Sequence, residues 1–132
     1  MRIRQLAPPR EFGVGERGGT LHHAADLYLD PDEMVTFRAP TGSELDVTRK
    51  SWGYYLTPSL NQRLVEHGLR AALCAGVPRS AGEAPRMYVL AVETEGEAAF
   101  NAYLSAERMH VVAWLDSDDA VLRAAAVLDS SR

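Results

Sequence analysis

The chain has 132 residues, of which 46% are hydrophobic and 24% are charged, and its formal net charge is −4. A chain of this length can bury one core of its own, and its composition argues against a disordered or fibrous protein. The acidic balance argues against nucleic-acid binding, and no apolar run approaches the roughly 20 residues of a membrane-spanning helix. The single cysteine, Cys74, excludes an internal disulfide, and the first residues lack the apolar region of a secretory signal. We therefore expect a cytoplasmic protein.

Residues 1–25 differ in character from the rest of the chain. They are rich in Gly, Pro and Arg and show neither a helical nor a strand period. We expect a flexible N-terminal arm over residues 1–25 and a single α+β domain over residues 26–132. Pairing of this arm with another subunit is the alternative.

The next segments have the pattern of a β-hairpin. Residues 34–39 alternate between apolar and polar, Pro40 and Gly42 mark a turn, and residues 44–56 are rich in β-branched and aromatic side chains. Gly53 lies inside the second predicted strand, which indicates a β-bulge or a close backbone approach.

A helix is predicted over residues 58–67. Thr57 can cap free backbone N–H groups, Pro58 suits the first helical position, and Gly68 is a natural stop. The remaining elements alternate between apolar strands and amphipathic helices. Strands are predicted at 69–77, 86–94 and 109–116, and helices at 96–107 and 117–129.

The predicted order β-β-α-β-β-α-β-α indicates a five-stranded mixed sheet with helices packed on it. Residues 86–94 are apolar on both faces, which is typical of a central strand. We expect Val89 to Val92 and Val111 to Leu115 to be neighbouring parallel strands, with the helix 96–107 crossing between them.

The segment from Asp46 to Leu64 carries an unusual mixture of cations and polar-tipped aromatics. The start of a helix attracts anions, Arg and Lys bind oxyanions, and aromatic rings offer a wall for a sugar or a base. The sequence therefore predicts a site for an anionic small molecule. The residues that we expect to bind it are Arg49, Lys50, Trp52, Tyr54, Tyr55, Thr57, Asn61 and Arg63.

Strand parity separates the two adjacent cations. A bulge at Gly53 would bring Arg49 onto the face of Trp52 and Tyr54 and leave Lys50 nearer the solvent. The alternative for the whole segment is structural: the rings belong to the core, and the cations pair with acidic residues of the same hairpin.

Other chemical signals are weaker. His22 and Asp26 would share a face on a helix, but metal sites need three or four ligands, so no metal is predicted. Cys74 lies in an apolar strand and is expected to be a buried, inert thiol. The acidic run at 116–119 is explained by helix capping, and the chain has no nucleotide or cofactor fingerprint, so no cofactor is predicted.

The same segment carries a resemblance. It matches the pattern D-V-x-R-K-x-W-G-x-Y-x-T-P-S-x-N-x-R-L from Asp46 to Leu64, and a later Val-Val-Ala-Trp-Leu-Asp follows at 111–116. In these residues the chain resembles a small, poorly characterised bacterial family encoded near sugar-nucleotide and surface-glycan enzymes. The resemblance implies a biosynthetic context and assigns no reaction.

Three functions fit these observations. The first is an accessory protein that binds an anionic metabolite such as a sugar nucleotide or a sugar phosphate. The second is a small enzyme acting on such a metabolite, with Asp46 or His110 as the acid or base and Tyr55 as a proton donor. The third is an oligomeric module, for example a homodimer, whose aromatics form a subunit contact.

Overall fold

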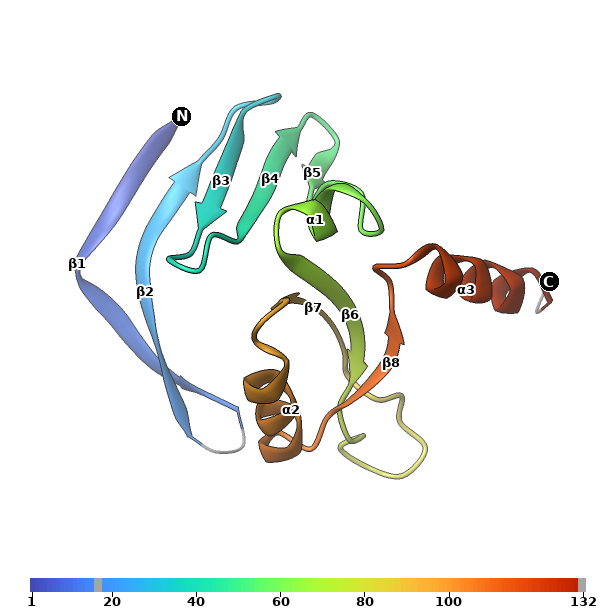
Figure 1. Ribbon diagram of the computed structural model, residues 1–132. Coiled ribbons are helices and arrows are strands. Elements are labelled where there is room, and N and C mark those ends of the chain that lie inside the picture. The colour runs from blue at the N-terminus through green and yellow to red at the C-terminus, as the bar shows by residue number, and fades with distance from the viewer. Residues whose placement is uncertain (16–17, 131–132) are drawn as a thin grey trace.

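The strands form three separate antiparallel sheets (Figure 1). The computed structural model describes residues 1–15 and 18–130, and it confirms an α+β fold. The sheets have the strand orders β1-β2, β3-β4-β5 and β7-β6-β8. The prediction of one five-stranded mixed sheet is therefore wrong. The chain turns back on itself by short connections, which favour antiparallel neighbours, and the sheets stay small.

The N-terminal segment forms a long two-stranded ribbon. Strand β1 (Arg2–Val14) pairs antiparallel with β2 (Gly19–Tyr28), and the register shifts between Gln5 and Arg10. This shift falls where two prolines interrupt β1, because proline cannot donate to a strand ladder. The expectation that residues 1–25 lack regular structure is wrong, because β1 and most of β2 lie within them. Strand β2 also continues across the boundary predicted at residue 25.

The predicted hairpin is confirmed as the first two strands of the second sheet. Strand β3 (Met34–Arg38) pairs with β4 (Glu44–Lys50), and Gly42 takes a φ of 93° in the turn between them. The second predicted strand, 44–56, is interrupted. It turns at residues 51–52, and β5 (Gly53–Tyr55) folds back onto β4.

Helix α1 is much shorter than predicted. It covers Arg63–Glu66 only, and Gly68 follows it with a φ of 82°, as expected of a helix stop. Residues before it form turns, in which Ser59 accepts a hydrogen bond from the backbone N–H of Arg63 through its hydroxyl, at 3.0 Å. The start predicted at Thr57 and Pro58 is wrong, because the helix begins at Arg63, five residues after Pro58.

The third sheet surrounds strand β6 (Leu69–Ala75). Strands β7 (Met87–Glu93) and β8 (His110–Trp114) lie on its two sides, and both run antiparallel to it. Strands β7 and β8 are thus parallel to each other, joined through helix α2 (Glu97–Ala106), but they are not neighbours. The prediction of adjacent parallel strands is wrong in this respect. The central place belongs to β6, whose small residues let α2 and α1 approach closely.

Two small clusters make up the core. One joins Phe100 and Leu104 of α2 to Cys74 on β6, and the Phe100 and Trp114 rings meet edge to face at 5.9 Å. The other is formed by Leu64, Leu69 and Ala71. No residue that the structure describes before Leu64 is buried. Helix α3 (Asp118–Ser130) was predicted correctly, and it projects away from the sheets (Figure 1).

Candidate functional site

Arg49 and Lys50 are positioned by the pairing of β4 with β5, and not by the bulge predicted at Gly53. Lys50 pairs with Gly53 across a two-residue turn, and Gly53 has a φ of 150°, a backbone conformation that favours glycine. Arg49 pairs with Tyr54, so both side chains lie on the same face of the sheet. The hairpin turn, rather than a bulge, brings these two residues together.

The polar groups of Arg49 and Lys50 are occupied within the chain. Nη1 of Arg49 donates to the carbonyl oxygens of Lys50 and, at 2.8 Å, of Gly53, and its guanidinium lies 5.3 Å from the centre of the Tyr54 ring. Nζ of Lys50 lies 2.5 Å from a carboxylate oxygen of Asp32. Arg49 therefore bonds to the β4-β5 turn, whereas Lys50 joins β4 to the segment before β3.

The other predicted ligands are spread around the same region. Nδ2 of Asn61 donates to Asp118 at 2.9 Å, and Nη1 of Arg63 lies 3.8 Å from Glu66. The Thr57 hydroxyl is buried and has no hydrogen-bond partner in the described chain. Because α1 has only four residues and starts at Arg63, it offers no helix N-terminus at Thr57 for an anion.

A small hollow gathers part of the predicted set. Its volume is about 380 Å³, and it is lined by Met34, Asp46, Thr48, Tyr55, Pro58, Ser59 and Arg63. Asp46 accepts a 2.6 Å hydrogen bond from the Thr36 hydroxyl there. The hollow thus unites Asp46 with Tyr55 and Arg63. It leaves out His110, which lies opposite Ala75 on the other sheet. Trp52, at the hairpin turn, is 70% exposed.

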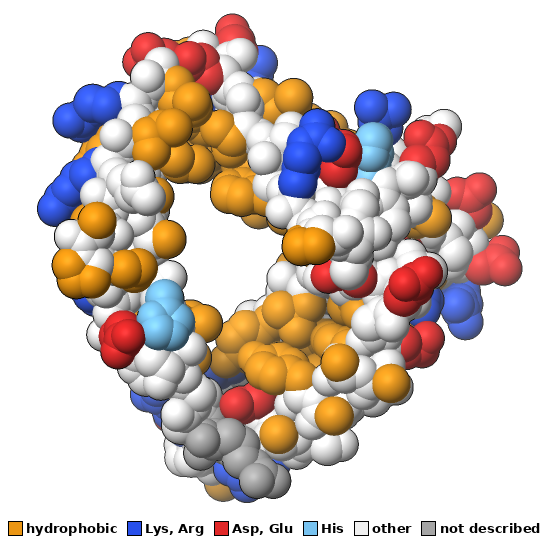
Figure 2. Space-filling model, turned by 60° about the vertical axis from the view of Figure 1, so that its left-hand side comes forward, with side chains coloured by type: hydrophobic (Ala, Val, Ile, Leu, Met, Phe, Trp, Pro, Cys, Tyr) orange, Lys and Arg blue, Asp and Glu red, His pale blue; other side chains and the backbone are white. Residues whose placement is uncertain are grey.

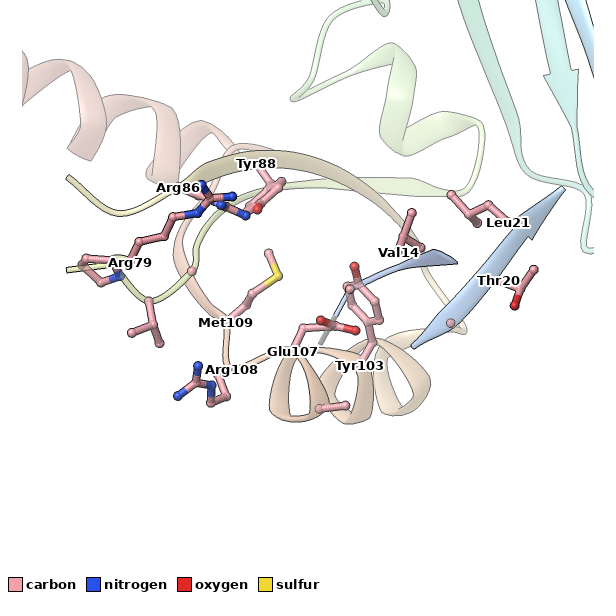
Figure 3. A pocket seen from close by; sticks show the side chains of 16 residues that line it. Val14, Thr20, Leu21, Arg79, Arg86, Tyr88, Tyr103, Glu107, Arg108 and Met109 are labelled. Atoms are coloured by element: carbon pink, nitrogen blue, oxygen red, sulfur yellow. The ribbon is translucent and has the colours of Figure 1, made fainter. Parts of the chain in front are cut away.

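A larger hollow lies between the tip of the β1-β2 ribbon, the end of α2 and the chain on either side of the 76–86 loop (Figure 3). Its volume is about 880 Å³. Val14 and Leu21 enter from the ribbon and Tyr103 from α2, while Arg79, Arg86 and Tyr88 stand on the other side. The ribbon tip approaches the end of α2 closely, since a Cβ on Gly15 would lie 2.4 Å from a carboxylate oxygen of Glu107.

Two of the cations in this larger hollow are free to bind a ligand. Neither Arg79 nor Arg86 makes an ion pair with any residue that the structure describes. Both side chains are exposed, so they carry full charge at little desolvation cost. The Tyr88 and Tyr103 side chains are 39% and 50% exposed, which leaves ring surface and hydroxyl groups open.

Sequence reasoning missed this hollow. Residues 78–85 fall between the predicted strands 69–77 and 86–94, and no function was predicted for them, although Arg79 lies in this segment, Arg86 follows it and Tyr88 lies in β7. Two arginines beside a proline-rich loop were the available signal. The ribbon side could not be foreseen, because residues 1–25 were expected to lack strands.

The histidines near the N-terminus and Cys74 have structural roles and do not form a metal site within the described residues. His22 lies 3.3 Å from Glu11, and His23 lies 2.8 Å from Asp26. Over residues 1–15 and 18–130, no three His, Cys, Asp or Glu side chains gather closely enough to hold a metal ion. Cys74 is fully buried, and burial raises the pKa of its thiol. Among the described helices, none has the length and apolar character to cross a bilayer.

The chain was compared with protein families, curated proteins and solved structures. None of the three comparisons gave a match. The resemblance of residues 46–64 to a bacterial family therefore stays a prediction, and the functional argument depends on the geometry of the site.

Proposed function

We propose that this chain is a small cytoplasmic accessory protein that binds an anionic metabolite, such as a sugar nucleotide, a sugar phosphate or a related biosynthetic intermediate. The observation that carries the proposal is the pair of guanidinium groups of Arg79 and Arg86, at one side of the 880 Å³ hollow, which form no ion pair within the described part of the chain. In a chain of net charge −4, two arginines left without acidic partners mark a place that favours an anion.

The chemistry of the two arginines suits phosphate. A guanidinium presents a planar fork of N–H donors, which matches two oxygens of a phosphate or a carboxylate. Such charge-assisted hydrogen bonds are stronger than neutral ones. A ligand with a diphosphate would engage both side chains, whereas a neutral sugar would engage neither as an ion pair.

The rest of the hollow suits the organic part of such a ligand. Sites for small molecules typically have volumes of roughly 300–1,000 Å³ and combine apolar walls with a few polar groups. Here Val14, Leu21 and Met109 supply apolar contact, and Tyr88 and Tyr103 supply ring faces with hydroxyl groups. A sugar or a base packs well on such rings.

A small enzyme is the second candidate. The observation in its favour is the shared hollow of Asp46 and Tyr55, with Arg63 at its side. A carboxylate, a phenol and a guanidinium could serve as base, donor and oxyanion ligand. The predicted third member, His110, does not line this hollow, so the enzyme would operate with Asp46 as its acid or base.

A thermal-shift screen tests the binding proposal. The panel is UDP-glucose, glucose 1-phosphate and citrate, with glucose as the neutral control. A ligand at a hundredfold excess over its dissociation constant adds about 2.7 kcal/mol to the free energy of unfolding. We expect at least one anion to raise the melting temperature and glucose to leave it unchanged. A panel without any shift would contradict the proposal.

A further inference from the structure

The β1-β2 ribbon is amphipathic. Cross-strand pairing places Ile3 opposite Leu27 and Phe12 opposite Leu21, and Val14 follows Phe12 by two residues. Leu21 and Leu27 have the same parity along β2, so these five residues lie on one side of the two halves of the ribbon, which we call the apolar ribbon face. Arg10 and His23 lie on the same side, between the two halves. The opposite face carries charged and polar residues, namely Arg2, Arg4, Glu11, His22 and Asp26. A strand pair with this pattern normally packs its apolar face on a core.

Within one chain, the apolar ribbon face has no such core. Its five side chains are between 36% and 57% exposed. Figure 2 shows the consequence: the molecule surrounds an open space, and hydrophobic side chains face it from more than one side. The sheet of β6, β7 and β8 adds to the exposed surface, since Val89 is 66% and Met87 is 48% exposed.

The total accessible surface shows how much is uncovered. It is 9541 Å² for a chain of 14.5 kDa. A compact monomer of this mass exposes about 6,900 Å². The excess is therefore about 2,700 Å² per chain, whereas a standard interface covers about 800 Å² on each partner and obligate homodimers cover more. The uncovered surface is of the size that a permanent subunit contact buries.

The ribbon also needs a cover in order to exist. A two-stranded hairpin alone in water is marginally stable at best. Covering the apolar ribbon face would stabilise the ribbon, and a second copy of the same chain is available for this wherever the protein is made. Charge favours this as well: residues 1–28 carry four arginines and three acidic residues, in a chain whose net charge is −4. The ribbon is weakly basic and the rest of the chain is acidic, so the two attract each other.

We infer that the apolar ribbon face is a subunit interface, against which a second copy of this chain packs in an obligate homo-oligomer. The ribbon of one copy reaches over the exposed apolar surface of its partner, as an exchanged arm. This inference does not depend on the proposed ligand. The two surfaces share Val14 and Leu21 at the ribbon tip, and the interface extends beyond them to Ile3 and Leu27.

The mass of the protein in solution is the first test. We expect light scattering to give at least twice 14.5 kDa, and the melting temperature to rise with protein concentration. Phe12→Asp places a charge in the apolar ribbon face and is expected to shift the mass to that of one chain or to abolish folding. Thr20→Asp, on the opposite face and across from Gly13, is the matched control and should keep the mass of the wild type.

A second measurement covers the case in which Phe12→Asp does not fold. Hydrogen exchange of the wild-type protein should show protected β1 and β2 amides at high concentration, and faster exchange there than in β6 after dilution. Unprotected ribbon amides at every concentration, or a single-chain mass with a melting temperature independent of concentration, would overturn the inference. A wild-type mass retained in folded Phe12→Asp would also overturn it.

Discussion

Arg70 and Asp116 form an ion pair that joins the central strand β6 to the segment after β8. Nε of Arg70 lies 2.5 Å from Oδ2 of Asp116, and the guanidinium lies 3.9 Å from the centre of the Trp114 ring. The Asp116 side chain is only 8% exposed. A carboxylate with so little access to water depends on its partner, because burial of an unpaired charge is costly.

Replacement of Arg70 by Met should therefore destabilise the protein. Because the Arg70 side chain is partly exposed, we expect a loss of about 2–3 kcal/mol, below the roughly 3–5 kcal/mol that breaking a fully buried pair costs. Urea denaturation measures it. The double variant Arg70→Met with Asp116→Asn should recover a large part of the loss, since no buried charge is then left. Equal stability of Arg70→Met and wild type would show that water already satisfies Asp116.

The local elements of the fold were largely predictable from the sequence, and their assembly was not. Turn residues and hydrophobic period predict the hairpin of β3 and β4, the helix stop at Gly68, and the strands and helices from β6 to α3. The ribbon was missed because Pro8, Pro9 and the glycines hide its alternation. The central position of β6 was missed because small residues such as Ala71 and Ala72 carry a weak hydrophobic signal, although they are among the most deeply buried.

The candidate site shows the same limit. Sequence spacing placed Asp46, Tyr55 and Arg63 in one region, and they do line one hollow. It could not show that Arg49 and Lys50 are engaged by the Gly53 carbonyl and by Asp32. Ion pairing depends on side chains brought together by the fold, which periodicity does not report.

The edge-to-face contact of Phe100 with Trp114 makes Phe100 a test of the larger core cluster. Phe100 is 9% exposed and packs between α2 and the sheet. We expect Phe100→Ala to cost about 3–4 kcal/mol, through lost burial and a residual cavity. Asn101→Ala, an exposed change on the same helix, should leave the unfolding midpoint nearly unchanged. A Phe100→Ala protein as stable as the control would show that α2 is not fixed on the sheet.

The thiol of Cys74 should be inert in the folded protein. It is fully buried, and burial raises its pKa from the ordinary value of 9.0. We expect slow reaction with a thiol reagent in native buffer and fast reaction in denaturant. Because the unfolded state releases this proton first, the contribution of Cys74 to stability should fall as the pH rises above about 9. Rapid labelling of native protein would contradict the burial.

Arg49 distinguishes the two candidate binding regions. Its side chain donates to two backbone carbonyls of the β4-β5 hairpin. We expect Arg49→Ala to increase hydrogen exchange in β5 and to leave the affinity for UDP-glucose within about twofold, less than the loss of a charged hydrogen bond to the ligand. If Arg49→Ala instead weakens UDP-glucose by tenfold or more while Lys50→Ala does not, the ligand binds at the hairpin, as the sequence alone predicts.

Calorimetric titration of the arginine variants with UDP-glucose tests the proposed binding site most directly. Arg79→Ala and Arg86→Ala should each weaken binding by about tenfold or more, because a charged hydrogen bond contributes on the order of 1.5–3 kcal/mol. Arg123→Ala, on α3 and outside both hollows, is the matched control and should bind like the wild type. Binding should also weaken with added salt. Wild-type affinity in both Arg79→Ala and Arg86→Ala would contradict the proposed site.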